Sequence, residues 1–250
     1  MNNNKINAVF LDCWDTLISF ECNEKRWNIL SLHQHCVNKD RIDWEEVFDF
    51  SENFFKSYYT SRLLFEIDIS SILSLFVKNF DIELDCPIET CTHEILKYLD
   101  PKPIDGISEF LDMLDEKGIY YAVISNTIYP TSDTLELINK LVPGHHFGFF
   151  LGSNVVGVKK PNPLFFKTGV TMGKQDIAQS MYIGDAFYQD VIGSYISGFH
   201  TSVWLNHKKK EKRFHDQIDL DGKIEYIEVD SYHTLISKIK EKNLSQANNT

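Results

Sequence analysis

Short apolar runs that end in polar residues recur along the chain. The first, Ala8–Leu11, leads directly into Asp12. It is too short for a helix and too apolar for a half-exposed strand, so we expect a strand buried on both faces, as in parallel sheets. Similar runs predict strands at 120–124, 147–151, 155–159, 180–183 and 201–205.

Segments with helical spacing separate most of these runs. Trp44, Val47, Phe48, Ser51, Phe55 and Tyr58 form one apolar face, and Asp43 with Glu46 resembles an acidic capping box at its start. Pro87 is placed to begin another helix. Helices are expected at about 25–37, 44–58, 72–80, 88–99, 107–117, 135–141, 163–170, 190–196 and 232–242.

The alternation of strands and helices stops after Leu17 and resumes after the proline-rich linker Asp100–Pro103. We therefore expect an α/β core with a parallel sheet, made of residues 1–19 and 101–243. Residues 20–100 would form an all-helical segment, either a domain that covers the site or a plain helical bundle without a role there. Residues 244–250 would form a disordered tail.

Polar residues follow four of the apolar runs. Asp12 follows the first, Ser125-Asn126 the second, Lys160 a third, and Asp185 a fourth, with Asp190 five residues further on. Ligands of open parallel sheets bind at the carboxyl ends of the strands. Asp12 alone fits equally well the N-cap of a following helix. The four segments together favour a site.

In this order the four segments resemble the motifs of the haloacid dehalogenase-like (HAD) hydrolase superfamily. The resemblance implies a Rossmann-like three-layer core, with the helical segment 20–100 as a cap. It also implies that Asp12 is the nucleophile, that Thr16 positions Asp12, and that Ser125 donates its hydroxyl to a phosphoryl group. The backbone amide of Asn126 would lie beside Ser125.

By the same resemblance Lys160 neutralises the nucleophile and the developing charge. Lys160 is preferred to Lys159 because the family's lysine directly precedes proline; Lys159 is then expected at the surface. Mg²⁺ would be held by Asp12, Asp185 and the backbone carbonyl of Trp14, with Asp190 in support. Converging carboxylates repel one another unless a cation neutralises them, and Mg²⁺ prefers oxygen ligands.

Trp14 departs from the family pattern, which usually has an acid-base aspartate at this position. Trp cannot shuttle a proton, and positioned acid-base catalysis contributes roughly 10²–10⁴-fold. Asp15 could replace the acid through an altered turn, another residue could supply the proton, or the leaving group could need none. Alternatively the protein is a catalytically impaired phosphate-binding or regulatory relative, or a 2-haloacid dehalogenase, since such enzymes carry an aromatic residue there.

The motif Gly184-Asp185 has the metal-binding form and favours a Mg²⁺-dependent phosphatase for a small phosphorylated metabolite over a dehalogenase. A further carboxylate would repel a carboxylate substrate unless a cation were bound.

Composition narrows the function classes. A net charge of −11 over 250 residues argues against nucleic-acid partners and anionic membranes. No apolar run approaches the roughly 20 residues of a membrane span, and we expect a cytoplasmic protein.

The five cysteines all lie within the first 91 residues, and this odd count argues against a disulfide framework. Cys86, Cys91 and His93, with His33, His35 and Cys36, lack the spacing of a standard zinc finger. We interpret the cysteines as core residues. The basic run His207–Arg213 is expected to be a solvated loop, the alternative being contact with an anionic substrate.

Overall fold

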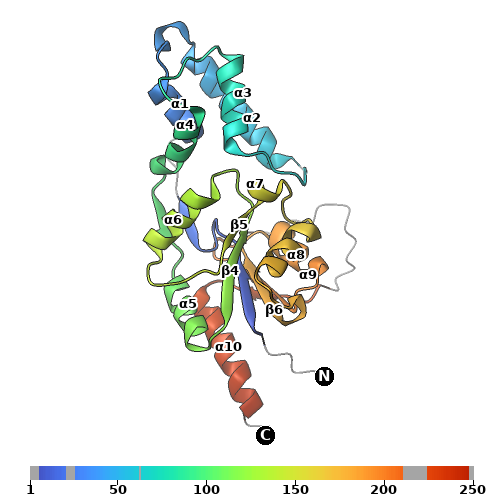
Figure 1. The fold of residues 1–250 in the computed structure, drawn as a ribbon. Helices are drawn as coiled ribbons and strands as arrows, with labels where there is room; N and C mark the ends of the chain where they lie inside the picture. Colours follow the sequence, from blue (N-terminus) through green and yellow to red (C-terminus); the bar gives the residue numbers. More distant parts are fainter. Residues whose placement is uncertain (1–5, 21–25, 62, 211–223, 248–250) are drawn as a thin grey trace.

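The computed structural model describes residues 6–20, 26–61, 63–210 and 224–247 (Figure 1). Its centre is a six-stranded parallel sheet in the order β5-β4-β1-β6-β7-β8. Five of these strands confirm the expected alternation, and β8 is an addition to it. The bounds are β1 Ala8–Leu11, β4 Tyr120–Ser125, β5 Phe150–Gly152, β6 Ser180–Gly184, β7 Thr201–Leu205 and β8 Ile227–Val229.

Strand β1 lies between β4 and β6, with Phe10 opposite both Ala122 and Tyr182. All four residues of β1 are buried. Because side chains alternate along a strand, Val9 and Leu11 pack into the core on one face, and Ala8 and Phe10 pack into the core on the other. This two-sided burial explains the unbroken apolar run.

Helices cover both faces and complete the three layers of a Rossmann-like core (Figure 1). One face packs against α5 (Ile107–Glu116), α6 (Thr131–Leu141) and α10 (Tyr232–Ala247). The other face packs against α8 (Pro163–Met172), which contacts α9 (Gly193–Ser197). Helix α10 continues four residues into the segment expected as a disordered tail; 248–250 lie outside the described residues.

Between β1 and α5 lies a helical insert, residues 26–61 and 63–100, whose buried apolar side chains form one cluster together with Ile128 and Tyr129 of the α/β core. Its longest helix, α2, begins after Asp43, whose carboxylate accepts the backbone N–H groups of Glu45 and Glu46 as the capping pattern predicts. The elements are η1 Trp27–Ile29, α1 Leu30–His35, η2 Lys39–Arg41, α2 Trp44–Thr60, α3 Ile69–Asn79, α4 Ile88–Glu94 and η3 Ile95–Tyr98.

Two short strands join the insert to the core. β2 (Ile18–Phe20) and β3 (Pro101–Pro103) pair antiparallel, so the expected linker is one strand of a two-stranded sheet. The chain thus leaves and re-enters the core at one place, which holds the insert over the carboxyl ends of the sheet (Figure 1).

The strand expected at 155–159 is wrong. Ser153–Val156 forms a short helix, α7, and Gly157 ends it with a φ of 75°. Val155 is exposed, and Val158 pairs with Phe65 of the insert through an isolated bridge. Lys160 therefore lies in a loop rather than at a strand end. The remaining elements are η4 Ile177–Gln179 and the π-helical turn η5 Phe187–Ile192.

Among the described residues, no helix combines the length and the apolar character that crossing a bilayer requires.

Candidate active site

Asp12 lies at the carboxyl end of β1 and is almost completely buried. Its backbone N–H donates to the carbonyl of Ile183, which extends the pairing with β6 (2.9 Å). One carboxylate oxygen, Oδ1, accepts hydrogen bonds from Ser125 Oγ (2.8 Å) and Lys160 Nζ (2.6 Å). The chain continues into a turn and β2, so the alternative of a helix N-cap is wrong.

Lys160 connects the predicted residues to one another. Its ammonium group is buried and donates to Asp12 Oδ1 (2.6 Å), Asp190 Oδ1 (2.6 Å) and the hydroxyl of Tyr182 (2.9 Å). The side chain of Asn126 holds the Lys160 backbone at both ends, accepting from its N–H (2.8 Å) and donating to its carbonyl (3.3 Å). These two hydrogen bonds hold the loop at Lys160 against Asn126, the residue that directly follows β4.

Asp12, Asp185 and Asp190 form an acidic cluster, with one oxygen of each within 4.8 Å of the others. Asp185 directly follows β6, and Asp190 lies on η5. Gly184 lets them approach, because a Cβ at that position would overlap the carboxyl group of Asp190. The backbone N–H of Ala186 donates to the second Asp190 oxygen (2.8 Å).

Burial dominates the electrostatics of the cluster. It raises the pKa of Asp12 to about 6, with Asp190 adding to the rise and Lys160 opposing it. Burial likewise raises the pKa values of Asp185 and Asp190. It would lower the pKa of Lys160, but Asp12 and Asp190 hold that pKa well above its usual range. Three carboxylates carry more charge than the two ammonium groups that pair with them, those of Lys160 and Lys210, and their oxygen donors fit Mg²⁺.

Two predicted residues have surroundings that the motif does not describe. The Thr16 hydroxyl is buried and has no hydrogen-bond partner among the described residues, so the expected contact with Asp12 is not a hydrogen bond. The Thr16 carbonyl accepts from Tyr232 (3.1 Å), which fixes the turn. The Trp14 ring packs edge-on against Tyr129, with centroids 6.1 Å apart.

Asp15 occupies a left-handed turn position, with a φ of 58°, where glycine would be free of strain. Its carboxylate pairs with Lys208 Nζ (2.6 Å) and more distantly with Lys210 Nζ (3.5 Å). His207 Nε2 donates to the Asp15 carbonyl (2.9 Å). The side chain therefore faces the basic segment, His207–Lys210, rather than bonding to Asp12.

Sequence reasoning misses the role of this basic segment. Lys210 pairs with Asp185, so the segment reaches the acidic cluster instead of forming a solvated loop. The strand order explains this position. Strand β7 lies beside β6, so residues that follow β7 emerge at the same edge of the sheet as Asp185. The rest of the predicted basic run cannot be compared, because 211–223 lie outside the described residues.

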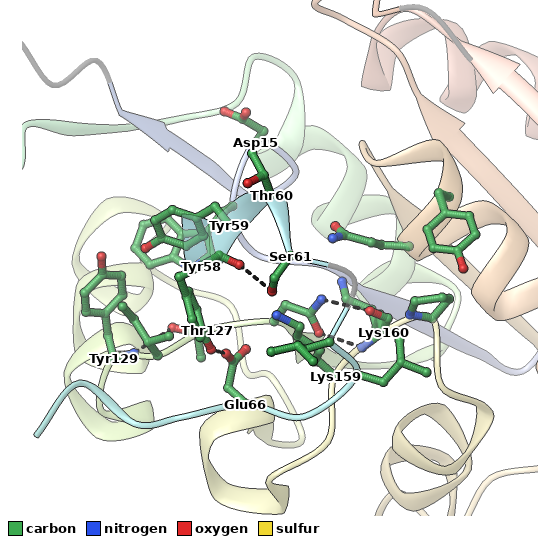
Figure 2. A pocket seen from close by; sticks show the side chains of 18 of the residues that line it. Asp15, Tyr58, Tyr59, Thr60, Ser61, Glu66, Thr127, Tyr129, Lys159 and Lys160 are labelled. Carbon is green, nitrogen blue, oxygen red and sulfur yellow. Dashed lines mark hydrogen bonds between the residues drawn. The ribbon is translucent and has the colours of Figure 1, made fainter. Parts of the chain in front are cut away.

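A cavity of about 750 Å³ opens between the core and the helical insert beside Lys160 (Figure 2). Its insert wall carries Tyr58, which contacts Glu66, and Ser153 of the core donates to Glu66 (2.6 Å). Lys159 is not simply a surface residue: its ammonium group lies 4.8 Å from the centre of the Tyr58 ring and lines this cavity.

Backbone pairing joins the two walls. Lys159 N–H donates to the Leu64 carbonyl (2.9 Å), and Glu66 N–H donates to the Gly157 carbonyl (3.0 Å). The insert therefore supplies one side of the cavity that contains Lys160.

Two curated relatives match parts of the chain. The bovine haloacid dehalogenase-like hydrolase domain-containing protein 3 is 29% identical over 98 residues, 39% of this chain and 38% of the relative. The mouse protein of the same name is 25% identical over 115 residues, 46% of this chain and 45% of the relative. The matched region thus spans less than half of these relatives.

Solved structures share the fold over nearly the whole chain. A HAD phosphatase from Thermococcus onnurineus aligns with a TM-score of 0.60 at 21% identity, covering 93% of this chain and 97% of that one. A 2-haloacid dehalogenase from Pseudomonas syringae aligns with a TM-score of 0.55 at 16% identity, covering 94% and 99%. The family model for haloacid dehalogenase-like hydrolases matches residues 53–203. The chain belongs to the haloacid dehalogenase-like hydrolase family.

Proposed function

We propose that this protein is a Mg²⁺-dependent phosphatase that hydrolyses a small phosphorylated metabolite through an aspartyl-phosphate intermediate. The observation that carries the proposal is the convergence of Ser125 and Lys160 on one oxygen of Asp12, inside a cluster of three carboxylates. A nucleophilic carboxylate, positive groups and a cation site are the parts that phosphoryl transfer requires.

In the first step an Asp12 oxygen forms a bond to phosphorus, and the bond from phosphorus to the leaving oxygen breaks. The Ser125 hydroxyl and the Lys160 ammonium group stabilise the transferred phosphoryl oxygens. Water then attacks phosphorus, which releases phosphate and restores the Asp12 carboxylate. Mg²⁺, held by Asp12, Asp185 and the backbone carbonyl of Trp14 with Asp190 in support, would neutralise negative charge on the carboxylates and the phosphoryl group.

Trp14 places a condition on the substrate. Because an indole cannot protonate a leaving alkoxide, we propose a substrate whose leaving group departs with little protonation, such as an acyl or aryl phosphate. The helical insert acts as a cap that excludes water and selects the leaving group, as supported by its wall of the cavity.

A dehalogenase would also tolerate Trp14, and a dehalogenase is among the similar structures. The acidic cluster disfavours that reaction, because Asp185 and Asp190 would repel the carboxylate of a 2-haloacid.

Phosphate release from a panel of acyl, aryl and alkyl phosphates tests the proposal, with Mg²⁺ present and after its removal by a chelator. We expect Mg²⁺-dependent turnover that Asp12→Asn and Asp185→Asn abolish and that Asp112→Asn, an exposed control on α5, retains. Halide release from a 2-haloacid without metal would establish the dehalogenase instead. Mg²⁺ binding without turnover of any phosphate would indicate a binding protein.

A further inference from the structure

A second group of side chains whose types can ligate a metal lies within the helical insert, apart from the acidic cluster. His35 is the last residue of α1, and Asp85 and Cys86 directly precede Pro87, the N-cap of α4. One ligand atom from each of His35, Asp85 and Cys86 lies within 4.8 Å of the others. The sulfur of Cys91, on α4, is not one of these three mutually close atoms, but it lies 3.8 Å from the sulfur of Cys86 and would complete a set of four ligands.

Backbone pairing builds this group. The residues after α1 run antiparallel to those before α4: Asp85 N–H donates to the His35 carbonyl (3.1 Å), and Val37 N–H donates to the Glu83 carbonyl (2.8 Å). An isolated bridge between Cys36 and Leu84 lies within this pairing. The main chain therefore places His35 opposite Asp85 whatever the side chains do.

His35 is oriented as a metal ligand would be. Its Nε2 lies 2.8 Å from Glu94, and its Nδ1 lies 2.8 Å from Asp85. Glu94 is itself fixed by Lys97 (2.9 Å). A metal-bound histidine usually donates its other ring N–H to a carboxylate. Without metal, Nδ1 shares a proton with Asp85. Once that proton is lost and Nε2–H stays on Glu94, Nδ1 and the Asp85 carboxylate are both available to bind one cation beside Cys86.

The ligand atoms of this group favour a different ion from the one that the acidic cluster would bind. Two thiols and an imidazole suit a borderline or soft cation, whereas Mg²⁺ takes oxygen ligands. Two thiolates at about 2.3 Å from a tetrahedral Zn²⁺ lie about 3.8 Å apart. This matches the observed separation of the Cys86 and Cys91 sulfurs.

We propose that His35, Asp85, Cys86 and Cys91 form a tetrahedral Zn²⁺ site that ties α1 to α4. The site revises the interpretation of these cysteines as core residues only: Cys91 is fully buried, but Cys86 is partly exposed beside Asp85. Binding requires both thiols to lose their protons, so it releases protons to solvent. Its role is structural and does not depend on the proposed phosphatase reaction.

Titration of the reduced, chelator-treated full-length protein with Co²⁺ tests the site. Thiolate-bound tetrahedral Co²⁺ gives strong visible bands and a near-ultraviolet sulfur-to-metal band, whereas Co²⁺ bound by oxygens alone does not. We expect these bands to saturate at one equivalent, to disappear on addition of Zn²⁺, and to persist in Asp185→Asn.

Cys86→Ser removes a partly exposed ligand, and we expect it to lose the sulfur-to-metal band or weaken it strongly. Cys36→Ser is the matched control, because Cys36 lies in the same pairing but bonds to Asn38 (3.0 Å). Circular dichroism of both variants checks that they fold like the wild-type protein. Absence of the bands in the wild-type protein overturns the site, as do bands that Cys86→Ser leaves unchanged. A reduced protein that binds no Co²⁺ yet readily forms a Cys86–Cys91 disulfide in air also overturns it.

Discussion

The ammonium nitrogen of Lys160 lies 2.6 Å from Oδ1 of Asp12, and both side chains are buried. The same nitrogen lies 2.6 Å from Asp190. One ammonium group thus pairs with both Asp12 and Asp190, which lie far apart in the sequence. Its removal would leave the acidic cluster without its buried counter-charge.

Lys160→Met is expected to destabilise the metal-free protein by about 3–5 kcal/mol, because breaking a buried ion pair leaves uncompensated charge. Mg²⁺ should then raise the melting temperature more in Lys160→Met than in the wild type. Differential scanning calorimetry with and without Mg²⁺ measures both effects. Lys159→Met is the control and should change stability by less than about 0.5 kcal/mol. Equal stability of the two variants would show that Lys160 does not compensate the cluster.

Because position 14 holds Trp14 instead of an acid, we predict that kcat/KM depends steeply on how readily the leaving group departs. For aryl or acyl phosphates kcat/KM should exceed that for alkyl phosphates by roughly 10²–10⁴-fold, the usual worth of a positioned acid. A matched series of phosphate esters measures this. If Asp15 replaces the acid, Asp15→Asn should slow alkyl esters selectively. If alkyl and aryl esters react equally fast in the wild type and in Asp15→Asn, another residue supplies the proton.

Gly184→Ala should displace Asp190, because the added methyl group would overlap the Asp190 carboxyl. Lys160 would then lose one of its two carboxylate partners. We expect kcat to fall about 10²-fold, the cost of small misplacements in a catalytic site. Gly173→Ala, at the end of α8, is the control, since its added Cβ meets the side chains of Tyr120 and Gln175 at 3.1 Å or more and no carboxylate of the acidic cluster. Wild-type kcat in Gly184→Ala would contradict this packing requirement.

Asp68 caps α3 and gives a pH-dependent prediction. Burial alone would raise its pKa, but hydrogen bonds from Ser70 and Ser71 outweigh burial and lower it. A depressed pKa contributes stability above the unfolded value of 3.8, and this contribution is lost as pH falls through the folded pKa. Asp68→Ala should therefore cost about 1 kcal/mol near neutral pH.

Below about pH 4 the difference between Asp68→Ala and the wild type should shrink. Urea unfolding of the two proteins across pH measures it. A difference that grows on acidification would contradict the assigned cause.

Strands β1, β4 and β6 could be predicted because each is buried on both faces, so its apolar run does not depend on its neighbours. The polar residues that end them could be predicted for the same reason. Strand β8 could not: among Ile227–Val229 only Val229 is buried, which leaves a weak pattern.

Two features depended on contacts that sequence does not show. The apolar run around Val155 has the composition of a strand, but it forms a short helix in which Val155 is exposed, and the partner of Val158 is Phe65 from the insert. The basic segment has the composition of a solvated loop, but the neighbouring position of β7 brings Lys210 to Asp185. Both segments therefore take their structure from contacts with residues that lie far away in the sequence.

The most direct test of the phosphatase proposal starts with an acyl phosphate that carries a labelled phosphoryl group. The reaction is quenched during turnover, and the label is then located on the protein. We predict Mg²⁺-dependent label on Asp12, its absence in Asp12→Asn, and its retention in Asp15→Asn. Phosphate release with no label on Asp12, or undiminished turnover by Asp12→Asn, would contradict the aspartyl-phosphate mechanism.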